Sequence, residues 1–111
     1  MGLIMGTKTR HKNLDGSYKI TDTRTLDEAR QENLNHFRET TTDLIVSAGY
    51  DEIWQRNVAM GIIEKGQAQA GTAYISACRN EYLRCKALIL AATTNDEADS
   101  VTFHPPVPEG L

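Results

Sequence analysis

The stretch TAYISACRNEYLRCKALILAAT, residues 72–93, decides the fold class. Its mostly apolar stripe recurs at alternating steps of three and four residues, which is the period of an α-helix with one buried face. The stripe consists of Tyr74, Cys78, Glu81, Cys85, Leu88 and Ala92. Leu83 and Leu90 fall on a second side, so we expect this helix to be buried on more than one face.

Cys78 and Cys85 are the only cysteines, and both lie inside this helix. Two helical turns separate them by about 10 Å. A disulfide needs Cα atoms within about 7 Å, so the pattern predicts two free, buried thiols on one helix face. Such usage is typical of a chain made in a reducing cytoplasm. Because no histidine or third cysteine lies nearby, we expect no metal site and no cofactor.

Two further helices precede this one. Thr25-Leu26-Asp27-Glu28 has the form of a capping box, and Gly49 is a typical helix stop. Asp51 is the next N-cap, and Gly61 inside the helix that follows indicates close approach of another backbone. We expect a break between Gly66 and Gly71. The buried face of the first helix is predicted to contain Leu34, Phe37, Thr41, Leu44 and Ala48.

Charge divides the chain into a basic start and an acidic remainder. Residues 1–24 carry five bases against two acids, a net charge of +3, whereas residues 25–111 carry seven bases against thirteen acids, a net charge of −6. The overall charge of −3 conceals this division. The first 24 residues are therefore predicted to be a basic arm attached to an acidic body.

The arm has the pattern of a small β-hairpin over residues 7–22. Polar alternation in 7–12 leads to the turn signal Asn13-Leu14-Asp15-Gly16, and residues 17–21 alternate again. A lone two-stranded unit is marginal in water, so we expect a partner surface to cover it. The arm residues predicted to bind that partner are Lys8, Arg10, His11, Lys12, Tyr18 and Ile20.

Residues 95–111 are predicted to form an acidic, proline-rich tail. The sequence predicts a linker at Asp96–Asp99 and a short strand at Val101–Phe103. The rest of the tail is predicted to be extended chain near polyproline II. The tail residues predicted to bind a partner are Val101, Phe103, Pro105, Pro106 and Val107. Two alternatives stay open for Phe103, which either folds back onto the helices or inserts into another chain. Trp54, the only tryptophan, is either a core residue or an interface anchor.

Several function classes are excluded by what the sequence lacks. No run of about 20 apolar residues indicates a membrane span. No nucleophile motif, phosphate loop or dinucleotide fingerprint is present, so we expect no enzyme, no catalytic residue and no small-molecule substrate. The carboxylates of the first helix are assigned to caps and solvent. A peripheral DNA contact through the arm stays open, although the acidic body would oppose it.

The predicted architecture is mainly α. It consists of an extended arm or hairpin over 1–24, a small bundle of two to three helices over 25–94, and an extended tail over 95–111. Ordering an arm costs about 1–2 kcal/mol per residue, and so small a core supplies little to offset that. We therefore expect neighbouring subunits to hold both arms.

The arm Thr7–Arg24, the capped helices that start at Thr25 and Asp51, and the tail Val101–Leu111 together resemble small accessory or connector subunits of tailed-phage virions. The resemblance is one of construction and covers the whole chain. It implies a structural protein that joins or stabilises subunits of a capsid, connector or tail, located in the virion as a homo- or hetero-oligomer. The alternative is a small regulatory protein that contacts nucleic acid or a host protein through the basic arm.

Overall fold

The computed structural model describes residues 5–108 and confirms a mainly helical chain with a small antiparallel hairpin near its start. The hairpin pairs β1 (Lys8–Lys12) with β2 (Tyr18–Asp22). Four helices follow within the described residues: α1 (Leu26–Ser47), α2 (Glu52–Ala59), α3 (Lys65–Ala91) and α4 (Asn95–Asp99). The molecule is elongated, with extents of 60 × 38 × 24 Å.

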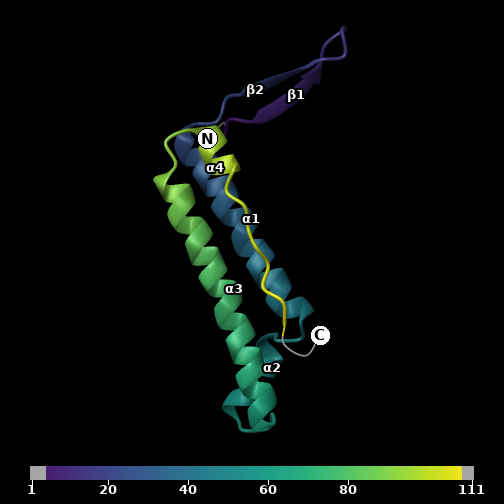
Figure 1. The fold of residues 1–111 in the computed structure, drawn as a ribbon, viewed down its shortest axis with the longest axis vertical. Helices are drawn as coiled ribbons and strands as arrows, with labels where there is room; N and C mark the ends of the chain where they lie inside the picture. Colours follow the sequence, from purple (N-terminus) through teal and green to yellow (C-terminus); the bar gives the residue numbers. More distant parts are fainter. Residues whose placement is uncertain (1–4, 109–111) are drawn as a thin grey trace, which may run out of the picture.

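The two long helices, α1 and α3, lie side by side and run in opposite directions, and α2 closes the end of the bundle away from the hairpin (Figure 1). Two apolar clusters occupy their interface. One contains Leu34, Phe37, Cys85 and Ile89, and the other contains Ile45, Tyr74, Ile75 and Cys78. Both cysteines are free and buried, as predicted, and burial raises the pKa of each thiol.

The start and end of α1 follow the predicted local signals. The Thr25 hydroxyl accepts from the backbone N–H of Glu28, and the Glu28 carboxylate accepts from the backbone N–H of Thr25, which completes the capping box. At the other end, Gly49 adopts φ of +93°, a conformation that favours glycine, and the chain leaves the helix there.

Helix α2 begins at the predicted N-cap, where Asp51 accepts from the backbone N–H of Trp54. The prediction that Gly61 lies inside this helix and close to another backbone is wrong. This glycine lies two residues beyond the end of α2 with φ of +73°, and a side chain there would meet open space. Glycine is therefore favoured at this position by its backbone conformation and not by a close neighbour.

The break expected between Gly66 and Gly71 is also wrong, because α3 is continuous from Lys65. Its N-cap is Glu64, whose carboxylate accepts from the backbone N–H groups of Gly66 and Gln67. Gly71 is buried inside the helix, where a Cβ atom would overlap the indole of Trp54 and the ring of Tyr50. The close approach predicted at Gly61 is thus made at Gly71, by aromatic rings.

The expectation that α3 is buried on a second side is wrong as well. Leu83 and Leu90 are about half exposed. Leu88, which was predicted in the buried stripe itself, is also about half exposed, so that prediction is wrong at this position. Helix α3 is covered by α1, by α4 with the segment after it, and near its start by the rings of Trp54 and Tyr50. These elements leave one side of this long helix facing solvent within the described residues.

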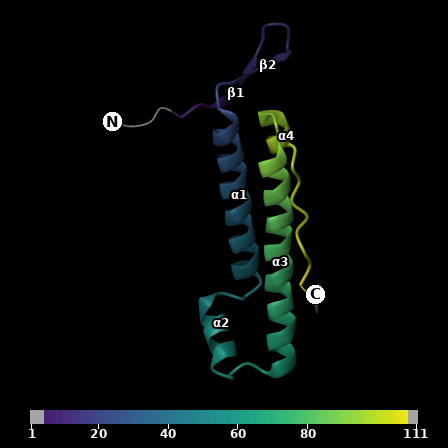
Figure 2. The same cartoon turned by 90° about the vertical axis from the view of Figure 1, so that its left-hand side faces the viewer.

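The segment after α3 differs from the predicted acidic linker and strand. Thr94 caps a five-residue helix, α4, by accepting from the backbone N–H of Glu97. Residues 101–108 contain no helix or strand, so Val101–Phe103 is not a strand. This segment runs back alongside the two long helices (Figures 1 and 2).

We expect Gly71→Ala to lower the free energy of unfolding by about 1–2 kcal/mol, because the new methyl group overpacks the Trp54 and Tyr50 rings. Alanine is otherwise about 1 kcal/mol better than glycine in a helix, so the sign of the change identifies the steric cause. Urea denaturation followed by circular dichroism measures it. Gly66→Ala, whose Cβ would meet only the flexible Glu64 carboxylate, is the matched control and should be neutral or stabilising.

Candidate interaction surface

The hairpin is a free-standing ribbon that projects beyond the helical bundle (Figure 2). Every residue from Thr7 to Thr21 is exposed, which includes all of β1, the turn, and β2 except its last residue. Tyr18 and Ile20 are 51% and 61% exposed, although both are apolar enough to be buried in a larger sheet. The arm residues that were predicted to bind a partner therefore lie on the ribbon, outside the core of their own chain.

Strand register divides the ribbon into two faces. Arg10 lies opposite Ile20, and Lys12 lies opposite Tyr18, while His11 lies opposite Lys19. Side chains alternate along a strand, so the first two pairs share one face and the third pair belongs to the other. We call the first the Arg10–Tyr18 face. The Arg10 guanidinium lies 3.7 Å from the centre of the Tyr18 ring, which orders both side chains on that face.

The turn at the ribbon tip is tied by its own polar groups. The backbone N–H of Asn13 donates to the carbonyl of Ser17 at 2.7 Å, and Asp15 accepts from the Ser17 N–H and hydroxyl. Gly16 takes φ of +89°. These bonds leave Leu14 fully exposed at the tip. Sequence reasoning missed Leu14 as a candidate contact because it treated these four residues only as a turn.

The base of the ribbon is fixed by Arg24, whose side chain is only 4% exposed. Its guanidinium donates to Asp22 at 2.8 Å, to Asp99 at 2.7 Å and to Glu32 at 2.9 Å. These carboxylates come from the ribbon, from α4 and from α1 respectively. The cluster of Arg24, Asp22, Glu32 and Asp99 is called the base cluster below.

Further contacts join the ribbon to the helices around the base cluster. Lys8 donates to Asp99 at 2.6 Å, and the side chain of Asn33 on α1 donates to the same carboxylate. Gly6 donates its backbone N–H to Glu28, the residue that closes the capping box of α1. A Cβ atom at Gly6 would overlap the backbone of residues 23 and 24, so glycine is required at this crossing.

The base cluster lowers the pKa of two of its carboxyl groups, Asp22 and Asp99. Hydrogen bonds from the Arg24 guanidinium hold the pKa of Asp22 and of Asp99 well below the usual range for aspartate. The same bonds raise the pKa of Arg24 above its ordinary value. Asp22, Asp99 and Arg24 therefore stay charged at neutral pH.

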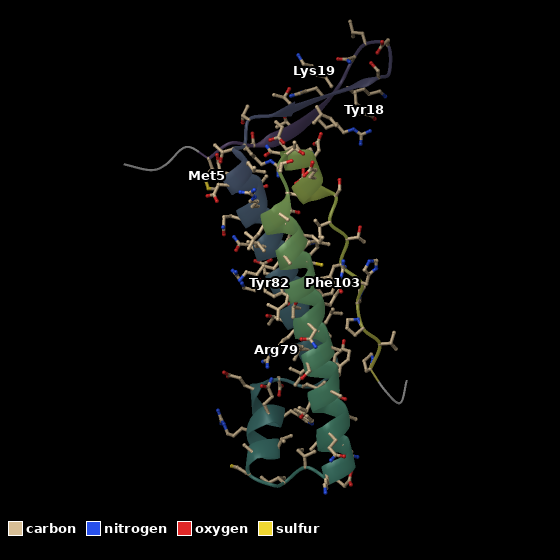
Figure 3. The ribbon with its side chains drawn as sticks, turned by 60° about the vertical axis from the view of Figure 1, so that its left-hand side comes forward. Met5, Tyr18, Lys19, Arg79, Tyr82 and Phe103 are labelled. Carbon is tan, nitrogen blue, oxygen red and sulfur yellow. The ribbon has the colours of Figure 1, made fainter. Side chains whose placement is uncertain are left out.

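The structure places the predicted tail residues in two environments. Phe103 is half-buried against Phe37, with ring centres 5.7 Å apart, and Val101 packs on the same cluster. The backbone N–H of His104 donates to Glu81 at 2.6 Å, and hydrogen bonds from Arg84 hold the pKa of that carboxyl at about 2. Pro106 is half-buried, whereas Pro105 and Val107 are exposed. Figure 3 shows Phe103 on the tail beside the helices. Within the described residues, Phe103 folds back onto its own chain.

Trp54 is half-buried and packs inside its own chain. Its ring lies 4.6 Å from that of Tyr50, and Tyr50 in turn contacts Tyr74. Beside these rings, a groove of about 330 Å³ opens between α1, α2 and α3. Arg79 and Tyr82, which Figure 3 shows on α3, contribute to its lining.

The outer side of α1 carries acidic side chains. From the sequence pattern, these carboxylates are predicted only to be helix caps and solvent-exposed groups. Glu39 lies two residues from both Phe37 and Thr41 and so points away from the core, and Asp43 is one turn further along. Both arginines of α1 have other partners: Arg30 donates to the carbonyl of Ala92, and Arg38 donates to Asn35 on the same helix and to Tyr82 on α3. Both arginines therefore make their hydrogen bonds elsewhere than with Glu39 or Asp43.

Residues 5–108 were compared with the requirements of a metal site and of a membrane-spanning helix. This part of the chain contains no group of three or more metal-ligating side chains. None of its helices has both the length and the apolar character needed to cross a bilayer.

No family model, curated protein or solved structure matches the chain.

Acid should weaken the fold through the base cluster. Asp22 and Asp99 have folded-state pKa values below those of unfolded aspartate, which is about 3.9. Their contribution to stability is therefore complete above about pH 5 and is lost as the pH falls below 4. Urea denaturation between pH 2 and 7 should show the free energy of unfolding falling over that acidic range.

Asp99→Asn should lower stability at pH 7 and flatten its decline in acid, because one of the responsible carboxylates is gone. Asp43→Asn removes an exposed carboxylate outside the base cluster and serves as the control, with the wild-type decline retained. An unchanged acid decline in Asp99→Asn would contradict the assignment.

Proposed function

We propose that this chain is a structural assembly protein, and that the ribbon is the arm by which it joins neighbouring subunits of a large complex. The observation that carries the proposal is the combination of an anchored base and an exposed tip. A two-stranded hairpin on its own is marginal in water. Here buried charge fixes its base, while Leu14, Tyr18 and Ile20 remain exposed.

The composition of the ribbon supports a protein partner. Tyrosine and arginine are enriched among residues that dominate binding energy at protein interfaces. Tyr18 and Arg10 stack on one face of the ribbon, where both are held in place before any partner arrives. Preorganised side chains lose less entropy on binding, so such a face supports specific contact.

The setting we propose is a tailed-phage virion, in which the chain would be a non-catalytic capsid, connector or tail component. The support is the likeness in construction described above, namely an elongated helical body with an arm that projects from one end (Figure 1). The exposed part of the tail, including Pro105 and Val107, would be a further contact with neighbours.

A second candidate function is a regulatory protein that contacts nucleic acid. The observation that favours it is the exposure of Arg10, His11, Lys12 and Lys19 on the ribbon. Such groups can bind phosphates. The acidic outer side of α1 disfavours this candidate, since it would repel a polyanion that approached along the body.

The assembly proposal is tested by sedimentation of a lysate from the organism or virus that encodes the chain. We expect the full chain to sediment with particles far heavier than its own 12.3 kDa, in constant proportion to their other proteins. A variant in which Asn-Gly replaces residues 10–20 shortens the ribbon but keeps its base, and it should remain at the top of the gradient.

Lys65→Glu, an exposed change at the opposite end of the bundle, is the matched control and should sediment like the wild type. A wild-type chain found only as a free 12.3 kDa protein would overturn the assembly proposal. Release from particles by nuclease, together with salt-dependent retention on DNA that the ribbon variant loses, would support the nucleic-acid candidate instead.

A further inference from the structure

We propose that the neighbour bound by the ribbon is a second copy of this chain, and that the Arg10–Tyr18 face docks on the acidic outer side of its α1. This inference rests on the assembly function proposed above and adds the identity of the partner and of the receiving surface. The contact joins two different surfaces of the chain, so each copy offers both an arm and a receptor.

Charge complementarity is the first argument. The face presents Arg10 and Lys12, and Lys8 at its base is already paired with Asp99. The receiving side presents Glu39 and Asp43, while the two arginines of α1 are engaged elsewhere. The two surfaces therefore carry opposite charge that is not neutralised within the described part of one chain.

The spacing of the charges is the second argument. Arg10 and Lys12 are two residues apart on a strand, so they are separated by about 6.6 Å along it. Glu39 and Asp43 are four residues apart on a helix, which is a rise of about 6 Å. A strand laid along the helix can thus pair both charges at once, and electrostatic register of this kind fixes how two surfaces align.

The apolar groups fall beside these charges. Ile20 and Tyr18 lie opposite Arg10 and Lys12 on the same face of the ribbon, and both are exposed. On the receiving side, Val46 follows Asp43 by three residues and is 51% exposed. With Lys12 placed at Asp43, Tyr18 is the apolar residue of this face nearest in register to Val46, and docking would remove apolar surface of both from water.

The ribbon cannot make this contact with its own α1. Its base is fixed at the start of α1 by the base cluster, and from there the ribbon leads away from the bundle while α1 runs in the opposite direction (Figures 1 and 2). A second copy of the chain presents the same acidic side of α1 and is free to approach the ribbon. Because the contact is largely ionic and exposed, it should weaken as salt is added.

Sedimentation velocity of the purified full chain at 50 mM and 500 mM salt tests the proposal. We expect reversible self-association that is stronger at low salt. Arg10→Glu with Lys12→Glu should weaken it by about tenfold or more, and Glu39→Lys with Asp43→Lys should do the same. Arg56→Glu with Lys65→Glu imposes the same change in net charge as the ribbon variant at two exposed positions on α2 and α3, and should have no effect.

The fourfold variant that carries both reversals restores the complementarity with signs exchanged, so its association should return to within about threefold of the wild type. A ribbon that is merely damaged by Arg10→Glu and Lys12→Glu would not be rescued in this way. Mixing the ribbon variant with the α1 variant should likewise restore association, because each supplies the surface that fits the other.

A wild-type chain that stays monomeric at low salt and high concentration would overturn the proposal, as would association that neither reversal weakens. If the chain is monomeric yet enters particles through its ribbon in the lysate, the partner is a different protein and the assembly function stands. If it neither self-associates nor enters particles, both proposals fail.

Discussion

The buried guanidinium of Arg24 is the group on which the arrangement of the arms depends. It is the meeting point of three carboxylates that come from the ribbon, from α1 and from α4. A buried charge that loses its partners is strongly destabilising, so these elements cannot easily separate one at a time. The hairpin is thereby made part of the bundle at its base, although it has no apolar core of its own.

This constraint gives the exposed end of the ribbon a defined direction. The basic groups at the base of the ribbon are paired within the chain. Lys8 pairs with Asp99, and Arg24 pairs with Asp22, Glu32 and Asp99. Arg10, Lys12 and Lys19 remain near the tip. An arm fixed at one end and charged at the other can present its Arg10–Tyr18 face repeatedly in the same orientation. A disordered basic tail could do so only by losing conformational entropy on each binding event.

The parts of the fold that sequence reasoning predicted are those with local causes. The capping box at Thr25, the N-cap at Asp51 and the hairpin turn each depend on residues within four positions of one another. Gly71 depends on the rings of Trp54 and Tyr50, about twenty residues earlier in the chain, and no local pattern reports such a contact. The exposure of Leu83 has a similar origin, since an apolar stripe predicts a buried face only where another element is present to cover it.

The same distinction explains what was missed in the candidate site. Arg24 counts as one of five basic residues in the arm, yet its partner Asp99 lies 75 residues away, so its burial could not be predicted from neighbouring sequence. The alternation of Tyr18 and Ile20 did predict the face on which they lie. Whether that face was covered depended on the rest of the fold.

The division of charge along the sequence becomes a division in space once the base cluster is formed. Arg30 and Arg38 make their hydrogen bonds elsewhere than with Glu39 or Asp43. The ribbon, which holds Arg10, Lys12 and Lys19, leads away from the bundle (Figure 2). Screening at about 0.1 M salt limits such charges to roughly 10 Å, so they act mainly when two surfaces are already close. In the contact that we propose, charge would set the register, and the exposed Tyr18 and Ile20 would supply the apolar burial. Because the core of the chain is small, apolar surface covered by the proposed neighbour would add substantially to the burial that its own fold achieves.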